Sequence, residues 1–549
     1  MKKAKKLMFQ GTSSHVGKSI LTTAFCRILA QDGYKTAPFK AQNMALNSYV
    51  TPSGGEIGRS TVAQAEAAGA EPIVQMNPVL LKPTGNSCSQ VIILGTSRGN
   101  YSASEYQNQY SQKAWASVKE SIEYMESHYD VMVIEGAGSP AEVNLKKNDI
   151  VNMRVAKECN APVFLIADID RGGALASIVG TLELLDEDER ALVKGLVINK
   201  FRGDIKLLEP ALTFLKERTG IPVLGVIPYL NKLGIDDEDS VSLQEIPDDH
   251  VMRDIHIAVI QTPKISNFTD FDALNHEPDV NVRFVQKGDL LGNPDLIIIP
   301  GSKNTTEDLL YLKREGYAKE ICELAEQGTP VIGVCGGYQM LGEKVSDPDH
   351  VESQNDEVDG LGLLPYTTVM QGVKNTYQVH FDCDDLPFLD MQFKGSDLKG
   401  YEIHMGETTL NKPAQTLFHI TSRSSKDVDV NDGYINEKHN VFGTYCHGVF
   451  DNDELRRAII NALRKRKGLS ELPIQFRYRE YKESEYDRLA DSVRRYFDMD
   501  LTLSDFTAQL ASAQPAPGGG GAAALTGALA ASLTAMAANV TAANPRYAE

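Results

Sequence analysis

Residues 11–19 read Gly-Thr-Ser-Ser-His-Val-Gly-Lys-Ser and follow a short apolar strand, expected over Lys6–Phe9. An amphipathic helix is expected next, because apolar residues recur at helical spacing over 20–29. A glycine-rich turn that joins a strand to a helix and ends in Gly-Lys-Ser is typical of a P-loop. The match is imperfect, because Thr12 stands where the common pattern has its first glycine and Gly11 lies one residue earlier.

This loop predicts a site for a nucleotide, because its backbone N–H groups can bind phosphate oxygens at the start of the helix. A carboxylate that could bind the accompanying Mg²⁺ is Glu135, at the end of an apolar strand. Asn199 ends another strand and is expected either to contact the adenine edge or to cap the next segment. A plain glycine-rich turn and a solvent-facing acid are the alternatives. The expected ATP-binding residues are Gly11, Thr12, Ser13, Ser14, His15, Val16, Gly17, Lys18, Ser19 and Asn199, and the expected metal ligands are Ser19 and Glu135.

The rest of the chain shows two successive α/β patterns, in which short apolar strands alternate with helical stretches. Ligands bind at the carboxyl edge of such parallel sheets, where most of these strands meet polar or glycine-rich loops. The first pattern predicts strands at Lys6–Phe9, Thr36–Phe39, Val131–Glu135, Val163–Ala167, Gly195–Asn199 and Val223–Ile227. The second predicts strands at Ile255–Gln261, Leu296–Pro300, Val331–Val334 and Val441–Tyr445.

A second candidate site begins at residues 331–339, which read Val-Ile-Gly-Val-Cys-Gly-Gly-Tyr-Gln. A cysteine between a strand and a helix, flanked by glycines, is typical of a nucleophile elbow, and the helix dipole favours a thiolate there. His447 follows a later strand and is the candidate base for Cys335. The backbone N–H groups of Gly301 and Gly336 are the candidate oxyanion donors. A small buried cysteine and an ordinary core histidine are the alternatives.

These motifs resemble two known families. The P-loop variant is similar to the loop of dethiobiotin synthetase-like ATPases, which activate carboxylates or carbamates. The cysteine and histidine motifs resemble a class I glutamine amidotransferase domain, which implies that Cys335 attacks the amide of glutamine and releases ammonia. Many such domains carry a glutamate two residues after the histidine, but Val449 stands there. Some other group must then orient His447, or the glutaminase is slow. Residues 400–406 also resemble a motif in the branch of these domains that is found in cobyrinic and cobyric acid synthases, and His404 is expected to line the site.

Three further segments resemble the cobyric acid synthase family, namely 38–48 (Pro-Phe-Lys-Ala-Gln-Asn-Met-Ala-Leu-Asn-Ser), 80–83 (Leu-Leu-Lys-Pro) and 168–173 (Asp-Ile-Asp-Arg-Gly-Gly). The resemblance implies ATP- and Mg²⁺-dependent amidation of the b, d, e and g carboxylates of adenosylcobyrinic acid a,c-diamide, with glutamine as the nitrogen source, to give adenosylcobyric acid. Because that substrate is anionic, a local basic cluster of Lys40, Arg59, Lys82 and Arg171 is hypothesised. The candidate substrate residues are Lys40, Asn43, Arg59, Lys82, Asp168, Arg171 and His404.

Composition excludes several other classes of protein. The net charge of −19 argues against a nucleic-acid-binding protein, which needs a basic face. No apolar run approaches the ~20 residues that span a bilayer, and the seven scattered cysteines suit a reducing compartment, so a cytoplasmic location is expected. Two alternatives stay open: amidation of another carboxylate, such as cobyrinic acid itself or a cell-wall precursor, and a non-catalytic P-loop regulator. The oligomeric state is not predicted.

The last part of the chain has a different composition. A Pro/Gly-rich stretch and an alanine-rich helix pattern resemble the start of the cyclodeaminase domain of formiminotransferase-cyclodeaminase. Fifty residues are too few for a separate helical domain, so a short helical appendage without folate chemistry is expected. The expected divisions are 1–233 for the ATP-dependent domain, 234–250 for an acidic linker, 251–465 for the glutamine amidotransferase domain, 466–500 for a helical segment and 501–549 for the appendage.

Overall fold

The structure, a computed structural model, describes residues 3–85, 87–230, 233–235 and 253–497. Its first half is built on a six-stranded parallel sheet with the order β12-β11-β10-β1-β9-β2. The strands are β1 (Lys5–Gly11), β2 (Thr36–Phe39), β9 (Val131–Glu135), β10 (Val163–Asp168), β11 (Val193–Phe201) and β12 (Val223–Pro228). All six strands predicted for this half are confirmed, with ends that differ by at most two residues.

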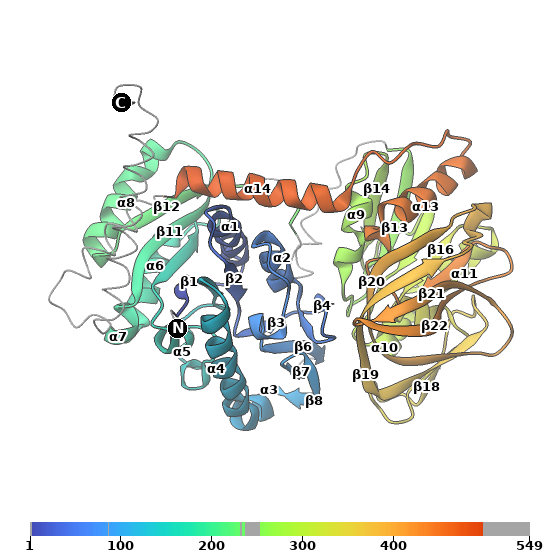
Figure 1. Ribbon diagram of the computed structural model, residues 1–549, viewed down its shortest axis with the longest axis horizontal. Coiled ribbons are helices and arrows are strands. Elements are labelled where there is room, and N and C mark those ends of the chain that lie inside the picture. The colour runs from blue at the N-terminus through green and yellow to red at the C-terminus, as the bar shows by residue number, and fades with distance from the viewer. Residues whose placement is uncertain (1–2, 86, 231–232, 236–252, 498–549) are drawn as a thin grey trace, which may run out of the picture.

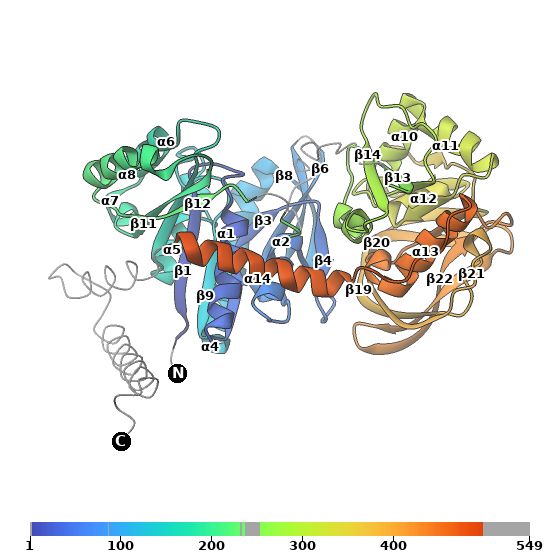
Figure 2. The ribbon, with the colours of Figure 1, turned by 90° about the horizontal axis from the view of Figure 1, so that it is seen from above.

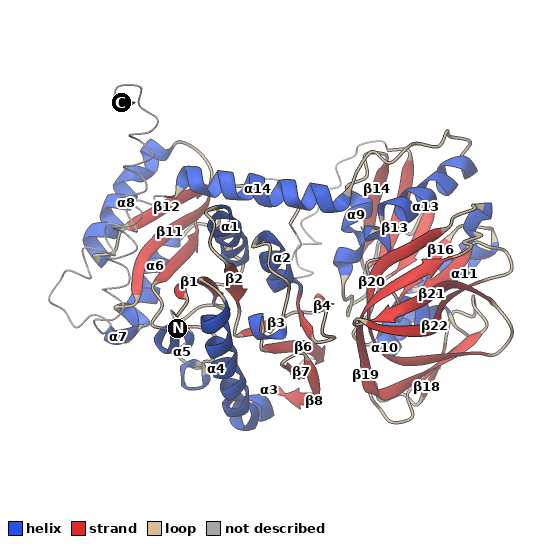
Figure 3. Cartoon of the chain, in the orientation of Figure 1, coloured by secondary structure: helices blue, strands red, loops and turns tan. Residues whose placement is uncertain are grey.

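Helices cover this sheet, as expected for parallel strands that need crossover connections (Figure 3). They are α1 (Lys18–Gln31), α2 (Arg59–Ala67), α4 (Ser111–His128), α5 (Met153–Cys159), α6 (Ala174–Leu184), α7 (Glu187–Arg190) and α8 (Ile205–Thr219). The core strands have almost no exposed side chains, and the burial pattern of β9 and β10 is continuous. Near-continuous apolar runs of this kind made these strands recognisable in the sequence.

A part of the first half that the sequence did not predict is an insertion between β2 and β9. It forms a four-stranded sheet and a separate two-stranded hairpin. The sheet contains β3 (Gln42–Met44), β6 (Val79–Gly85), β7 (Cys88–Ile93) and β8 (Thr96–Ser102), with the short helix α3 (Ala103–Glu105) after it. The hairpin consists of β4 (Ser48–Val50) and β5 (Glu56–Gly58).

The second half is built on an eleven-stranded mixed sheet. Its parallel part contains β14 (Val280–Val285), β13 (Ile255–Ile260), β15 (Leu296–Ile299), β16 (Val331–Val334) and β23 (Val441–Thr444) in this order. The four strands predicted here are confirmed to within a residue. The extension beyond β23 is antiparallel except for the parallel pair β17–β19, and it was not predicted. It contains β17 (Lys344–Ser346), β18 (Glu357–Asp359), β19 (Tyr366–Cys383), β20 (Gly395–Leu410), β21 (Gln415–Arg423) and β22 (Lys426–Ile435). The helices are α9 (Asp272–Asn275), α10 (Thr305–Glu315), α11 (Tyr317–Glu326), α12 (Gly336–Leu341) and α13 (Asp453–Arg466).

The two halves meet along the β4–β5 hairpin, which lies against the long strands β19 and β20. The hydroxyl of Thr376 donates to the carbonyl of Gly54 at 2.8 Å, and the Gln378 amide donates to the carbonyl of Val50. The ammonium of Lys374 forms an ion pair with Glu56 at 2.5 Å. The hairpin therefore docks by its backbone and by one buried charge.

The end of the described chain returns to the first half. Helix α14 (Tyr478–Tyr496) leaves the second half and runs along α1, as Figures 1 and 2 show from two directions. It buries Leu489 and Val493 in the core beneath α1, and the ring of Phe497 packs on Phe25 with centroids 4.9 Å apart. Helix α14 covers residues 478–496 of the predicted helical segment 466–500, and its apolar face packs on the first half. The predicted linker is described only at residues 234–235, and the appendage 501–549 lies outside the described residues.

Candidate active sites

The thiol of Cys335 is presented by a sharp turn between β16 and α12. The residue has φ 51° and ψ −104°, a conformation that L-residues rarely adopt. The turn is tight: a Cβ added to Gly337 would lie 1.9 Å from the carbonyl oxygen of Ile299. The thiol donates to the carbonyl of Ile403 at 3.2 Å. The predicted elbow is thus present as a strained turn that lifts the sulfur out of the sheet.

His447 lies beside Cys335 and is held by an acid that the sequence did not reveal. Its Nδ1 lies 2.6 Å from Oδ2 of Asp270, which belongs to the turn Phe268–Phe271 after β13. The other oxygen of Asp270 accepts from the backbone N–H of Gly448 at 3.2 Å. Asp270 therefore supplies an acidic partner for His447 although Val449 is not an acid, and it lies 177 residues earlier in the chain than the histidine.

The motif at 400–406 fixes the other side of the imidazole. The backbone of Tyr401 exchanges two hydrogen bonds with His447, at 3.1 and 2.8 Å. The ring of Tyr401 is stacked on the imidazole with centroids 5.1 Å apart, and its hydroxyl donates to Asp270 at 3.3 Å. Because the same motif supplies the acceptor for the Cys335 thiol, one segment of β20 contacts all three members of the site.

Burial and charge act on His447 in opposite directions. Burial lowers the pKa of His447, but the charges of Asp270 and Cys335 and their hydrogen bonds raise it more, to about 10. The side chain of His447 is only 2% exposed, so water screens these charges little. The protonated imidazolium is therefore the favoured form at neutral pH, which is the form that stabilises a thiolate at Cys335.

The glutaminase cavity is lined by side chains from both halves of the molecule. Cys335 and His447 face it from the second half, together with His404, and Lys82 reaches it from strand β6 of the first half. The ring of His404 is stacked on Tyr445 with centroids 3.9 Å apart, and its Nδ1 lies 2.8 Å from the carbonyl of Gly406. The structure therefore places His404 at the cavity, where the sequence predicts it.

The two glycines predicted as oxyanion donors are chain neighbours of Ser302 and Cys335, which line this cavity. A Cβ added to Gly301 would lie 3.1 Å from Cε1 of His447, and one added to Gly336 would lie 2.7 Å from the backbone nitrogen of Ser302. A side chain at position 301 would thus crowd His447, and one at position 336 would clash with the backbone of Ser302. Their role as donors stays a prediction.

The phosphate loop lies at the carboxyl end of β1, in the middle of the first sheet. A Cβ added to Gly11 would lie 2.5 Å from Cγ2 of Val16 and 3.0 Å from Nζ of Lys18. The close approach explains why a glycine stands at position 11 and not at Thr12. The Lys18 ammonium donates to the carbonyls of Ser13 and Gly138, at 2.9 and 3.0 Å, so it lies curled across the loop.

The residues predicted to hold a metal are in contact with each other. The hydroxyl of Ser19 donates to Oε1 of Glu135 at 2.8 Å, and the Lys40 ammonium lies 2.9 Å from the same oxygen. The amide of Gln64 donates to the other oxygen at 2.5 Å. A hydroxyl and a carboxylate next to a phosphate loop are the hard oxygen ligands that Mg²⁺ prefers, so this pair is suited to the ion.

Two other predicted residues, Asn199 and Asp168, hold the phosphate loop through hydrogen bonds and an ion pair. The amide of Asn199 donates to the carbonyl of Val16 at 2.8 Å, and the N-cap of the next helix, α8, is Asp204. Asp168 forms an ion pair at 2.9 Å with Lys200, whose ammonium also donates to the carbonyl of His15 at 2.8 Å. Both residues hold the loop in place, and contact with adenine or substrate stays a prediction for each.

The remaining candidate substrate residues have separate partners. Asn43 is buried and donates to the hydroxyl of Ser60 at 3.4 Å. The guanidinium of Arg59 lies over the ring of Tyr49, 5.0 Å from its centroid. Arg171 is exposed, and its guanidinium is 3.8 Å from Asp168. The members of the hypothesised basic cluster therefore have different partners. Lys40 is paired with Glu135, whereas Lys82 lies at the glutaminase cavity and is paired with Glu56 at 2.9 Å.

Comparisons with known families agree with this geometry. The family model described as the CobQ/CobB/MinD/ParA nucleotide binding domain matches residues 7–242. The model of the CobB/CobQ-like glutamine amidotransferase domain matches residues 256–455. The model of formiminotransferase-cyclodeaminase matches residues 502–549. The fold and its two sites thus define a glutamine amidotransferase joined in one chain to a P-loop nucleotide-binding domain.

Curated relatives identify the family to which this chain belongs within that class of protein. A cobyric acid synthase of Moorella thermoacetica is 52% identical over 500 residues, which cover 90% of this chain and 96% of the relative. That of Pelotomaculum thermopropionicum is 52% identical over 503 residues, which cover 90% and 95%. That of a Thermoanaerobacter species is 48% identical over 497 residues, which cover 90% and 97%. The chain belongs to the cobyric acid synthase family. It is therefore a glutamine-dependent amidoligase.

Proposed function

We propose that this enzyme uses ATP and glutamine to amidate the b, d, e and g carboxylates of adenosylcobyrinic acid a,c-diamide, giving adenosylcobyric acid for cobalamin biosynthesis. The observation that carries the proposal is the pairing of two sites in one chain. Cys335, His447 and Asp270 form a buried constellation for amide hydrolysis, while Lys18 and Ser19 lie on a phosphate loop. The resemblance of 38–48, 80–83 and 168–173 to cobyric acid synthases supports the choice of substrate.

The glutaminase half supplies ammonia. The Cys335 thiolate attacks the amide carbon of glutamine, and the negative charge passes to the amide oxygen. The His447 imidazolium then gives its proton to the leaving nitrogen, so that ammonia departs and a glutamyl thioester remains. Water, deprotonated by the neutral imidazole, attacks the thioester and releases glutamate and the thiolate. Asp270 holds His447 with Nδ1–H toward itself, which leaves Nε2 for these proton transfers.

The phosphate-loop half activates the acceptor. A substrate carboxylate oxygen attacks the γ-phosphorus of ATP, and ADP leaves, which produces an acyl phosphate. Ammonia then attacks the acyl carbon, phosphate leaves with its bridging oxygen, and a proton is lost to give the amide. Lys18 binds the outer phosphates and stabilises the charge that develops on them. The metal suited to Ser19 and Glu135 is Mg²⁺, which neutralises phosphate charge when it is bound.

Ammonia is released close to the interface between the halves. Lys82 of the first half lines the same cavity as Cys335, and the β4–β5 hairpin is hydrogen-bonded to strand β19 of the second half. Transfer from one half to the other within the protein keeps ammonia unprotonated, which is the form that attacks an acyl phosphate. This arrangement supports a direct passage between the two reactions.

The location that suits these reactions is the cytoplasm. All seven cysteines are free thiols in the structure, as in a reducing compartment. Within the described residues, no helix is long and apolar enough to cross a membrane.

Mass spectrometry of the corrinoid product tests the proposal. Adenosylcobyrinic acid a,c-diamide is incubated with ATP and Mg²⁺, with either glutamine or ammonium, for the parent enzyme and for Cys335→Ala. We expect four added amides with either nitrogen source in the parent, and four with ammonium alone in Cys335→Ala. If the parent adds no amide from either source, the corrinoid is not its substrate.

A further inference from the structure

The glutaminase cavity contains a buried ammonium group that the mechanism above does not use. Lys303 follows Gly301 in the loop between β15 and α10, lines the cavity with Cys335 and is only 8% exposed. Among residues 3–85, 87–230, 233–235 and 253–497, no hydrogen bond or ion pair reaches its ammonium group. A buried charge without a partner is costly, so a site of this kind is completed by something that enters the cavity.

The other charges around the cavity are already paired, with one exception. Lys82 and Lys374 share the carboxylate of Glu56, at 2.9 and 2.5 Å. The exception is Glu352, whose Oε2 accepts from the backbone N–H of Thr305 at 3.0 Å and whose carboxylate also lines the cavity. Lys303 and Glu352 thus provide one positive and one negative group on the same wall.

The two groups interact electrostatically but do not satisfy each other. Burial lowers the pKa of Lys303, and the charge of Glu352 opposes this only in part. Burial likewise raises the pKa of Glu352, and the charge of Lys303 opposes it. Each shift disfavours the charged form, so a ligand that brings the opposite charge to each group would stabilise both.

We propose that Lys303 and Glu352 bind the amino acid head of glutamine, with the ammonium of Lys303 on the α-carboxylate and the carboxylate of Glu352 on the α-ammonium. The inference rests on the proposed glutaminase function of Cys335, because the head group and the attacked amide belong to one molecule. It assigns the two residues as specificity determinants, since a charge-matched pair selects a zwitterionic head group over simple amides.

Truncated substrates test this assignment. Hydrolysis by the parent, Lys303→Met and Glu352→Gln is measured with glutamine, with 4-aminobutanamide, which lacks the α-carboxylate, and with glutaramic acid, which lacks the α-amine. In the parent, each truncation should lower kcat/KM about 10- to 100-fold, the effect of one charge-assisted contact. Lys303→Met should hydrolyse glutamine and 4-aminobutanamide equally well, through a raised KM for glutamine, while still discriminating against glutaramic acid. Glu352→Gln should hydrolyse glutamine and glutaramic acid equally well, while still discriminating against 4-aminobutanamide.

Two controls separate this assignment from other roles of the same residues. Lys319→Met removes an exposed lysine of α11 and should leave all three kcat/KM values unchanged. Alkylation of Cys335 by iodoacetamide, which has no head group, should keep its rate and pH profile in Lys303→Met. If all three amides lose kcat equally and alkylation slows, Lys303 acts on the thiolate and the assignment is wrong.

The outcome is distinguishable from a failure of the proposed function. Amidation with ammonium should be unaffected in both variants, because it does not use the glutaminase site. A parent enzyme that hydrolyses no glutamine would overturn the proposed glutaminase and this assignment together. A parent that hydrolyses glutamine but discriminates against neither truncated amide would overturn the assignment alone.

Discussion

The imidazole of His447 is fixed by residues from two distant parts of the chain. Asp270 accepts its Nδ1–H from the turn after β13, and Tyr401 on β20 stacks on its ring. Both residues are buried, so each contact acts in a medium of low dielectric constant. The ring therefore has one orientation, which places Nε2 toward the thiol.

Replacing this acid should disable the glutaminase without disabling the synthetase. Asp270→Asn removes one of the two charges that together raise the pKa of His447 from its ordinary 6.5 to about 10, the other being that of Cys335. The pKa of His447 should fall, so the imidazolium is lost at a lower pH and the alkaline limb of glutamine hydrolysis moves to lower pH. We expect kcat for hydrolysis to fall on the order of 10²- to 10⁴-fold. Ammonium-dependent amidation is the control, and an unshifted pH profile would contradict the assignment.

The phosphate loop depends on the absence of one side chain. Gly17 has φ 97°, and a Cβ there would lie 2.1 Å from Nδ2 of Asn199. Gly17→Ala should therefore displace Asn199 or the loop and abolish ATP-dependent amidation, with glutamine hydrolysis retained. Gly33→Ala is the matched control, because Gly33 has φ 86° and open space around it. It should cost only about 1 kcal/mol of stability. Equal ATP affinity for the two variants by calorimetry would contradict the account.

The sequence located most of these residues because they adjoin buried strands. Cys335 follows β16, His447 follows β23 and Glu135 ends β9, and apolar runs mark each of these strands. Asp270 could not be found in this way, because it lies in a turn with no strand or helix periodicity. Only the tertiary fold brings it to His447, so a local pattern contains no sign of it.

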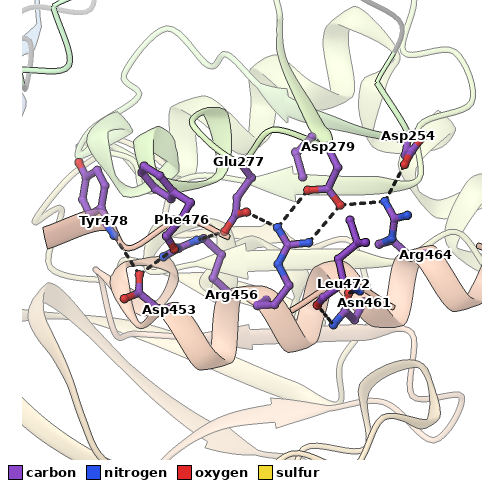
Figure 4. A network of polar contacts seen from close by, with 12 residues as sticks. Asp254, Glu277, Asp279, Asp453, Arg456, Asn461, Arg464, Leu472, Phe476 and Tyr478 are labelled. Carbon is purple, nitrogen blue, oxygen red and sulfur yellow. Dashed lines mark hydrogen bonds and ion pairs between the residues drawn. The ribbon is translucent and has the colours of Figure 1, made fainter. Parts of the chain in front are cut away.

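At the scale of elements, helix α13 is anchored by a row of arginines. Arg456 is 0% exposed and forms ion pairs with Glu277 at 2.7 Å and with Asp453 at 2.8 Å. Arg464 forms ion pairs with Asp279 and Asp254, as Figure 4 shows along the same face of the helix. The network connects α13 to the turn before β14 and to the segment that leads into α14.

Breaking this row should unfold the second half at lower denaturant concentration. Arg456→Met leaves Glu277 buried with one fewer cation and removes a donor to the carbonyl of Phe476. We expect a loss of about 3–5 kcal/mol in the free energy of unfolding, measured by urea denaturation. Lys465→Met, at an exposed position of the same helix, should change the stability by less than about 0.5 kcal/mol. A loss for Arg456→Met as small as this control would show that the network is not structural.

Several of the strands that the sequence predicted are buried on both faces. The parallel strands β9, β10, β15 and β16 are short apolar runs with no exposed residue. Strand β19 has eighteen residues with exposed and half-buried positions in its centre, so its sequence looks like a loop. Hydrogen bonds from its partner strands hold β19 in an extended conformation. A single sequence contains little trace of such pairing.

At the scale of the whole molecule, one buried carboxylate links the halves. Burial alone would raise the pKa of Glu56, but the ammonium groups of Lys374 and Lys82 hold it well below its usual value of 4.5. An acid with a depressed pKa stabilises the folded protein above its unfolded pKa and loses that contribution as the pH falls. Glu56 therefore stabilises the interface at neutral pH, and this contribution declines below about pH 4.5.

Thermal unfolding can detect this contribution. Between pH 5 and pH 3, the melting temperature of the parent enzyme should fall further than that of Glu56→Gln, which has no carboxylate to protonate at this position. At pH 7, Glu56→Gln should be the less stable protein, because Lys82 and Lys374 then face each other without a counter-charge. Parallel pH profiles for the two proteins would contradict the role given to Glu56.

Ammonia released at Cys335 should reach the acyl phosphate without leaving the protein, and an isotope experiment can measure this transfer. The parent enzyme is supplied with ATP, adenosylcobyrinic acid a,c-diamide, glutamine labelled with ¹⁵N in its amide, and an excess of unlabelled ammonium. Mass spectrometry then measures the label in each new amide. If ammonia passes from Cys335 to the acyl phosphate within the protein, the amides should be mostly ¹⁵N despite the excess. Amides that match the isotope ratio of the solution would contradict the account.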